Sequence, residues 1–278
     1  MFENVKGFTY AFDKKKNGDA RPYSQKVIKG LKGLGDNVKP HIIDFSKYGV
    51  PQRRNRFILV GVQKSIGTPD KFKSMLDSYK DSFLQNKGLP VNTTLREAIS
   101  DLLQSNGEIP TPDRKGFKSG IYGIEESNYQ KLLRGDYTES HIVPDSHSFA
   151  KHTEEKSICY KNLLANYEIR GKRIDGDARK KWNVKQRSIT ILDPNTISPT
   201  ITGHPDDYLH YCEPRIMTVR ECARIQSFPD WYEIKKKYTT GGKMRKIEVP
   251  RYTQVGNAIP PLFAELAGFV LKQIIKYD

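Results

Sequence analysis

The front of the chain alternates between helical and strand-like patterns of apolar residues. Between residues 23 and 33 apolar side chains recur at helical spacing, at Val27, Leu31 and, just beyond, Leu34. The segments 38–45 and 56–62 are short apolar runs of strand length. We therefore expect a helix followed by two strands. An isolated hairpin is only marginally stable in water, so these two strands need further strands to pair with.

Two more helices are predicted after residue 67. Thr68 is a good N-cap and Pro69 suits a first helical position. The expected inward face of this helix is Phe72, Met75, Leu76, Tyr79 and Phe83. Thr94 and Glu97 have the spacing of a capping box. They predict a short second helix with Leu95, Ala98, Ile99 and Leu102 inward.

The last quarter contains another capping box and a long amphipathic helix. Thr218 and Glu221 are spaced as a box, so we expect Glu221 to bind the Thr218 amide. This helix should end near Phe228 and Pro229. Pro260 and Pro261 should open the final helix. Its expected inward residues are Leu262, Leu266, Phe269, Val270 and Ile274.

The middle of the chain is polar and strongly basic. From about 105 to 197 the sequence is rich in Gly, Lys, Tyr and His, and residues 151–187 hold eleven Lys or Arg against five Asp or Glu. The whole chain carries a net charge of +15. Such an excess favours a polyanionic partner, because neutralised phosphates release their counterions. Nucleic acid fits best. No run resembles a membrane span of about 20 apolar residues or a signal peptide, so we expect a cytoplasmic protein without a membrane partner.

The three cysteines indicate neither disulfides nor a metal centre. Cys159, Cys212 and Cys222 are too few and too scattered for a disulfide framework or a zinc motif. His147 and His152 could approach Cys159, but their loose spacing is a weak signal. We expect reduced thiols and no metal.

Four motifs resemble those of the DNA cytosine-5 methyltransferases and follow the order of that family. They are Phe2-Glu-Asn-Val5, Gly49-Val-Pro-Gln-Arg-Arg-Asn-Arg-Phe-Ile-Leu-Val-Gly61, Thr218-Val-Arg-Glu-Cys-Ala-Arg-Ile-Gln-Ser-Phe-Pro-Asp230 and Gln254-Val-Gly-Asn-Ala-Ile-Pro-Pro261. The resemblance covers essentially the whole chain. It implies an α/β fold, a partial S-adenosylmethionine-dependent methyltransferase sheet with an inserted target recognition domain.

The resemblance implies three groups of site residues. Glu3 would be the catalytic acid that binds the flipped cytosine, and a dry pocket should raise its pKa. Arg56 would bind the cytosine carbonyl oxygen and brace Glu3, with Gln52 and Arg54 in support. Asn257 and Ala258 would border the S-adenosylmethionine pocket. Arg220, Arg224 and Gln226 would organise the contact with the recognition domain.

The basic segment between the second and third motifs corresponds to the recognition domain of the family. Its Lys and Arg side chains suit phosphates and guanine edges. The candidate DNA-binding residues are Arg170, Lys172, Arg173, Arg179, Lys180 and Lys181, with Lys185 and Arg187 beyond them. A solvated basic face without a register is the alternative. No target sequence can be read from the segment.

The family implies four parts: residues 1–67 as the end of the catalytic domain, 68–104 as a helical connection, 105–215 as the recognition domain, and 216–278 as a brace and return helix. The glycine loop and the Pro-Cys nucleophile of the family precede Glu-Asn-Val, so the chain is expected to need an N-terminal half that carries them. We expect part of an enzyme of a restriction–modification system, inactive alone, that acts on duplex DNA. The alternatives are a non-catalytic DNA-binding recognition subunit, a fragment of a disrupted gene, and an RNA methyltransferase.

Overall fold

The chain forms two compact units in the computed structural model. The structure describes all residues except 12–19, 140–141, 187–188, 240–243, 245–246 and 277–278. We call the first the sheet unit; it comprises Met1–Gly49, Arg53–Val91 and Pro261–Asp278. We call the second the central unit; it comprises Val50–Gln52 and Asn92–Pro260.

The sheet unit is built on a three-stranded antiparallel sheet. Its strands β1 (Phe2–Val5), β2 (Asp36–Asp44) and β3 (Asn55–Gln63) lie in the order β1-β3-β2. The two strands predicted from the apolar runs are confirmed as β2 and β3. Strand β1 was not predicted, because four residues carry too little alternation to register as a strand.

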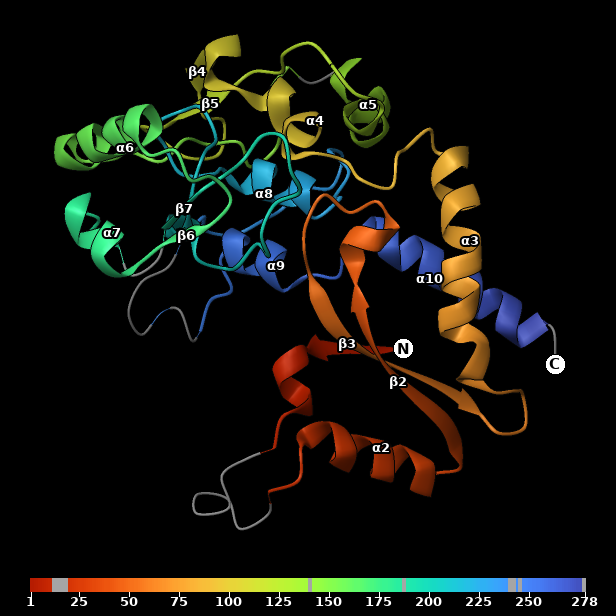
Figure 1. The fold of residues 1–278 in the computed structure, drawn as a ribbon. Helices are drawn as coiled ribbons and strands as arrows, with labels where there is room; N and C mark the ends of the chain where they lie inside the picture. The colour runs from red at the N-terminus through yellow and green to blue at the C-terminus, as the bar shows by residue number, and fades with distance from the viewer. Residues whose placement is uncertain (12–19, 140–141, 187–188, 240–243, 245–246, 277–278) are drawn as a thin grey trace. The chain divides into compact units, whose positions relative to one another are not determined.

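One face of this sheet is covered by α2 (Tyr23–Gly33), as Figure 1 shows. Phe57 and Leu59 of β3 point to this face together with Val38 of β2. Val27, Ile28 and Leu31 of α2 pack on them. The predicted helix is confirmed, but Leu34 is not one of its inward residues. Leu34 is the C-cap residue and is 81% exposed.

The helices α3 (Phe72–Asn86) and α10 (Pro261–Lys276) pack against each other. Helix α3 also contacts β2 on the side opposite α2, and α10 contacts the single turn η2 (Phe45–Tyr48) that follows β2. The ring of Phe72 lies 5.7 Å from that of His41, and Phe263 lies 4.3 Å from Phe45. The short helix η3 (Pro69–Lys71) precedes α3 and has Thr68 at its N-cap, although no side-chain cap bond forms. Phe269 of α10 was expected to point inward but is 43% exposed, and its ring contacts Tyr79 of α3.

The stretch Arg251–Ile275 is the most apolar helical part of the chain. The stretch is 25 residues long and contains an 18-residue window with a mean hydropathy of 1.4, enough by length and composition to cross a membrane. It was not expected from the sequence, in which no membrane span was predicted. Within it, however, α10 buries Phe263, Leu266, Ala267 and Val270 completely in the sheet unit. The apolar character of α10 is therefore explained by core packing, a common origin of such stretches.

The central unit contains short helices, a hairpin and a small sheet. The helices are α4 (Leu95–Ile99), α5 (Asn128–Arg134), α6 (Glu154–Asn166), α7 (Gly176–Lys181), α8 (Val219–Ile225) and α9 (Arg251–Asn257). The hairpin is β4 (Glu108–Pro110) with β5 (Lys118–Gly120), and the sheet orders as β6 (Arg173–Ile174), β7 (Ile189–Ile191) and β8 (Tyr208–Leu209). Single helical turns, η1 (Lys6–Thr9), η2 (Phe45–Tyr48), η4 (Ser100–Leu102), η5 (Gln104–Asn106), η6 (Gly135–Glu139) and η7 (Pro205–Asp207), complete the two units.

Local sequence signals determine where several of these helices begin. Both predicted capping boxes form: Glu97 binds the Thr94 amide and Glu221 binds the Thr218 amide, each at 2.7 Å. A third box, Ser127 with Gln130, opens α5. The inward residues expected for α4, namely Leu95, Ala98, Ile99 and Leu102, are all fully buried.

A buried network of charges centres on Arg224 of α8. Its Nε and Nη2 atoms each donate to Asp230 at 2.6 Å, and Nη2 also donates to Asp101 at 3.1 Å. All three side chains are fully buried. Burial alone would raise the pKa of Asp230, but the charge of Arg224 outweighs burial and holds that pKa below its ordinary value. Arg224 therefore connects η4, α8 and the loop after α8.

We expect Arg224→Met to destabilise the chain by about 3–5 kcal/mol, because two buried carboxylates lose the guanidinium that they share. Among the described residues, Asp101 would keep only Arg134 as a cationic partner, and Asp230 would keep only Arg220 at 3.6 Å. Urea unfolding at pH 7 measures this change. As a control, Lys180→Met removes an exposed ion pair with Asp177 and should cost at most about 1 kcal/mol. Equal losses for the two variants would contradict the central role of Arg224.

Candidate active site and DNA interface

Glu3 and Arg56 meet across two neighbouring strands. In the β1–β3 register Val5 pairs with Arg56 and Glu3 pairs with Ile58. Glu3 and Arg56 are therefore diagonal neighbours on the same face, within reach of long side chains. The Nε atom of Arg56 lies 3.0 Å from Oε1 of Glu3, and the two side chains are only 12% and 15% exposed. The structure thus brings together the two principal residues that the sequence resemblance indicated.

Burial changes the electrostatics of this pair. It raises the pKa of Glu3 above its ordinary value, and the charges of Arg56 and Arg54 oppose the rise without cancelling it. Burial also lowers the pKa of Arg56, which the Glu3 charge partly restores. The second nitrogen, Nη1, donates to the Asn55 carbonyl at 2.9 Å and fixes the guanidinium. A carboxyl with a raised pKa beside a fixed donor suits a group that must hold and deliver a proton.

Arg54 and Gln52 lie at the turn that leads into β3. Arg54 is 1% exposed, and its amide donates to Asp44 Oδ1 at 3.3 Å. Gln52 belongs to the central unit. Its Nε2 donates to Gln226 Oε1 at 2.9 Å, and its Oε1 accepts from the Ile201 amide at 2.7 Å. The charge of Arg54 acts on Glu3, whose pKa it lowers. Gln52 instead binds a side chain and a backbone amide of the central unit.

The candidate cofactor residues lie at the C-terminal end of α9. Asn257 is exposed and Ala258 is half-buried. Gly256, just before them, is packed so closely that a Cβ there would lie 2.6 Å from the Gly203 amide nitrogen. Only glycine fits this approach, so Gly256 fixes the position of the Asn-Ala turn. The role of Asn257 and Ala258 in cofactor binding stays a prediction.

The six candidate DNA-binding residues divide into two kinds. Arg170 donates to the Leu164 carbonyl at 2.8 Å, and Arg179 donates to the Val184 and Lys185 carbonyls at 3.1 and 3.3 Å. These bonds use the two guanidinium groups to shape the loops around α7. Lys172, Arg173, Lys180 and Lys181 are exposed, and Lys180 pairs with Asp177 at 3.4 Å. Lys185 is paired with Glu155, and Arg187 lies outside the described residues.

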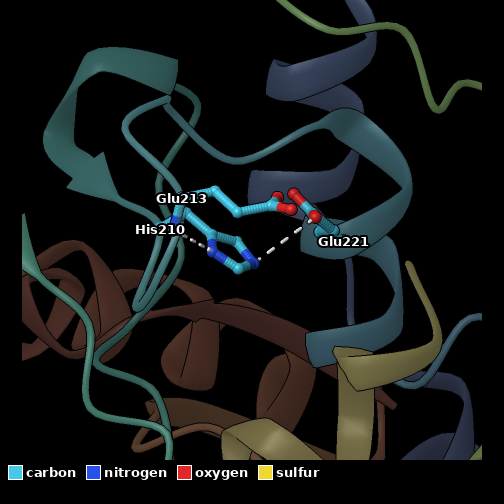
Figure 2. Close-up of side chains that lie close together, drawn as sticks. All are labelled: His210, Glu213 and Glu221. Carbon is cyan, nitrogen blue, oxygen red and sulfur yellow. Dashed lines mark hydrogen bonds and ion pairs between the residues drawn. The ribbon is translucent and has the colours of Figure 1, made fainter. Parts of the chain in front are cut away.

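A group of metal-type ligands comes together where none was expected. His210, Glu213 and Glu221 place one ligand atom each within 4.8 Å of the others. Figure 2 shows the three side chains close together. Arg215 donates to both carboxylates, at 2.8 Å to Glu213 and at 2.6 Å to Glu221. His210 Nδ1 accepts from the Cys212 and Glu213 amides. Because the guanidinium already supplies the cation that the carboxylates need, this cluster fits an ion-pair core better than a metal centre.

Arg220, Arg224 and Gln226 are buried and hydrogen-bonded, and their expected role in organising the contact with a recognition domain stays a prediction. Arg220 donates to Asp145 and to the Pro229 and Tyr232 carbonyls, and Gln226 donates to the Val255 carbonyl. Glu221 forms the predicted cap and, in addition, the pair with Arg215. Burial would raise its pKa, but Arg215 lowers the pKa of Glu221 to about 2.

Burial also raises the pKa of every cysteine thiol in the chain. The pKa of Cys212 rises to about 11, that of Cys159 rises, and that of Cys222, which is 3% exposed in α8, rises further. The thiolate is the nucleophilic form of cysteine. The raised pKa values lower the thiolate fraction of all three at neutral pH.

Two features arise only from close packing of distant residues: the cluster around Arg215 and the stacking of Arg114 on aromatic rings. Neither has a motif or a periodic spacing. Arg215 could have been suspected from the acidic residues at 213 and 221, but charge runs of this kind are common on solvated surfaces.

The chain has an α/β methyltransferase-like fold. A crystal structure described as a DNA modification methyltransferase encoded within an E. coli prophage superposes with a TM-score of 0.62 at 19% identity, covering 99% of this chain and 68% of that one. The model of the C-5 cytosine-specific DNA methylase family matches residues 1–276. The chain belongs to this family.

Two curated relatives show how the chain compares in length. The type II methyltransferase M.Bpa9945I of Bacillus paralicheniformis is 28% identical over 295 residues, which cover 99% of this chain and 60% of the relative. The type II methyltransferase M.AquIB of Picosynechococcus is 43% identical over 88 residues, 30% of this chain but 63% of the relative. The chain thus spans about 60% of the length of M.Bpa9945I, a relative that matches nearly all of it. M.AquIB matches only 30% of the chain, and that match covers most of its own length.

We expect Arg56→Gln to raise the pKa of Glu3 further, because it removes a neighbouring positive charge while keeping much of the side-chain volume. Carboxyl-carbon NMR titration of Glu3 measures this pKa. In the native chain the folded state holds this proton more tightly than the unfolded state, so Glu3 should make the unfolding free energy fall as the pH rises above 4.5. Arg53→Gln is the exposed, adjacent control. A Glu3 pKa that fell in Arg56→Gln would contradict the pairing.

Proposed function

We propose that this chain is the part of a DNA cytosine-5 methyltransferase that binds duplex DNA and protonates the flipped cytosine. The Glu3–Arg56 pair carries the proposal: two long side chains from neighbouring strands, mostly buried, with the acid's pKa raised. The enzyme would act in the cytoplasm within a restriction–modification system, as the type II names of the relatives suggest.

The chemistry explains why these two residues are needed. Cytosine carbon-5 is a weak nucleophile until a thiolate adds at carbon-6 and a proton reaches the ring nitrogen N3. The base must leave the helix stack for this to happen. Glu3 would deliver the N3 proton, and Arg56 would bind the carbonyl oxygen beside it with its fixed guanidinium. Both residues bind the Watson–Crick side of the ring, which duplex DNA exposes only when the base is flipped.

S-adenosylmethionine would supply the methyl group. Asn257 is exposed at the end of α9, and the tight packing of Gly256 holds the turn that follows it in one position. Asn257 and Ala258 fit one edge of a cofactor site, and the rest of such a site would come from other residues.

The nucleophile would come from outside these 278 residues. Each of the three thiols has a raised pKa, and none follows a proline. A segment with a Pro-Cys nucleophile and a glycine loop would complete the enzyme, either on the same polypeptide or on a second one.

A non-catalytic recognition subunit is the second candidate. The charge of +15 and the exposed basic residues beside α7 favour DNA binding whether or not chemistry follows. The raised pKa of Glu3 favours the enzyme, because a recognition subunit has no need of a buried acid.

Binding to duplex DNA should weaken steeply with salt. Log affinity falls with log salt, and the triple substitution Lys172→Gln, Lys180→Gln and Lys181→Gln should make this fall less steep. The magnitude of the slope should decrease by up to about 3, about one for each phosphate that is no longer neutralised. Fluorescence anisotropy of a labelled duplex measures the slope. The matched control replaces Lys29, Lys32 and Lys71 of the sheet unit with Gln, for the same change in net charge. Equal effects of the two triples would show that net charge, not the α7 surface, drives binding.

With a segment that carries the Pro-Cys motif added, Glu3→Gln should lower single-turnover methyl transfer by about 10²–10⁴-fold while DNA binding persists, because the acid is lost but its size is kept. Transfer of label from S-adenosylmethionine to cytosine is the readout, and this chain alone should transfer none. Glu97→Gln is the control, since it alters only the cap of α4. Glu221→Gln is unsuitable, because it would leave Arg215 without its buried partner. Label transferred by the chain alone would refute the proposed division.

A further inference from the structure

The hairpin β4–β5 presents a short basic loop from the central unit. Pro110 pairs with Lys118, and the Thr111 amide donates to the Phe117 carbonyl at 2.9 Å, which closes the loop. Gly116 has φ +80°, a conformation that glycine adopts without strain. The loop carries Arg114 and Lys115 at its tip.

The guanidinium of Arg114 is held by two aromatic rings. Its Cζ lies 3.5 Å from the centroid of Phe117, in stacking contact, and 4.9 Å from that of Tyr238. Tyr238 is 6% exposed and is fixed by a hydrogen bond to Asp113. Stacking uses the face of a guanidinium and leaves its N–H donors directed outward in the plane.

Those donors meet no acceptor within the described part of the chain. The adjacent carboxylate, Asp113, is already bonded to Tyr238 at 3.1 Å and paired with Arg251. Arg251 in turn donates to the Lys236 carbonyl and to Ser146. Arg114 is half-buried, and burial lowers its pKa. A partly desolvated, oriented and unused donor fork is what a partner with two neighbouring acceptors would bind.

The arginines beside α7 provide the contrast. Arg170 and Arg179 donate hydrogen bonds to backbone carbonyls. Arg114 is instead oriented by aromatic rings, which accept none of its N–H donors in the plane of the guanidinium. Lys115 is exposed next to it, and Lys151 lies 5.0 Å from the Phe117 ring, so the surroundings are positive. The partner is therefore expected to be anionic overall.

We propose that Arg114 is a base-reading residue of the DNA interface, with its stacked guanidinium donating two parallel hydrogen bonds to O6 and N7 of a guanine in the major groove. This inference rests on the proposed function. A DNA phosphate offers a similar pair of acceptors. The fixed stacking favours the guanine, because a rigid fork adds discrimination between bases, whereas a phosphate contact needs only charge.

Selection of bound sequences from a random duplex library with the full chain tests the assignment. The native chain should select a motif with a guanine at one position, preferred by about 5- to 150-fold over other bases. Arg114→Lys keeps the charge and most of the stem but loses the planar fork. It should abolish the preference at that position and leave the others. Arg114→Ala should do the same with weaker binding overall.

Arg96→Lys is the matched control, because Arg96 is an exposed arginine of the central unit without such stacking; it should leave the motif unchanged. Thermal unfolding of Arg114→Lys should match that of the native chain. A uniform loss of affinity over all sequences would assign Arg114 to a phosphate and overturn base reading. An unchanged motif and affinity would overturn the contact itself. A native chain that bound no duplex would instead refute the proposed function.

Discussion

The buried charge of Arg224 is the constraint on which the central unit depends. A guanidinium cannot shed its charge, so a fully buried one must be surrounded by carboxylates and carbonyls. Asp101, Asp230 and the Ala98 carbonyl supply these partners from segments more than a hundred residues apart. Arg134 and Tyr122 bind the same two carboxylates in turn. The short helices of this unit bury little apolar surface individually, and this shared charge network fixes how they meet.

The Glu3–Arg56 pair has the opposite character. It is mostly but not completely buried, and burial keeps the acid's pKa raised in spite of the adjacent charge. A saturated pair such as Arg215 with Glu221 lowers the pKa of its acid to about 2 and holds the charged form. Glu3 is prepared to carry a proton and Glu221 is not. The two glutamates have the same side-chain chemistry, and their surroundings shift the two pKa values in opposite directions.

The same distinction separates the arginines of the central unit. Arg179, Arg215, Arg220 and Arg224 have their donors bonded to protein acceptors, so they shape and stabilise the unit. Arg114 is oriented by stacking and keeps its donors for a partner. For a protein whose composition is basic throughout, the side chains available to DNA are those whose hydrogen bonds the fold has not already used.

Local signals in the sequence determined the elements of this protein, and the motifs determined its family. The strands β2 and β3, the helix α2 and both Thr–Glu capping boxes follow from periodicity and from contacts between residues close in sequence. The likeness to Glu-Asn-Val and Gln-x-Arg-x-Arg also indicated the pairing of Glu3 with Arg56. Only the tertiary structure decided that β1 is a strand, that Leu34 is exposed, and that Arg170 and Arg179 bind carbonyls while Arg114 stays available. The reason is physical: a strand needs a neighbour and a guanidinium needs acceptors, and both come from distant parts of the chain.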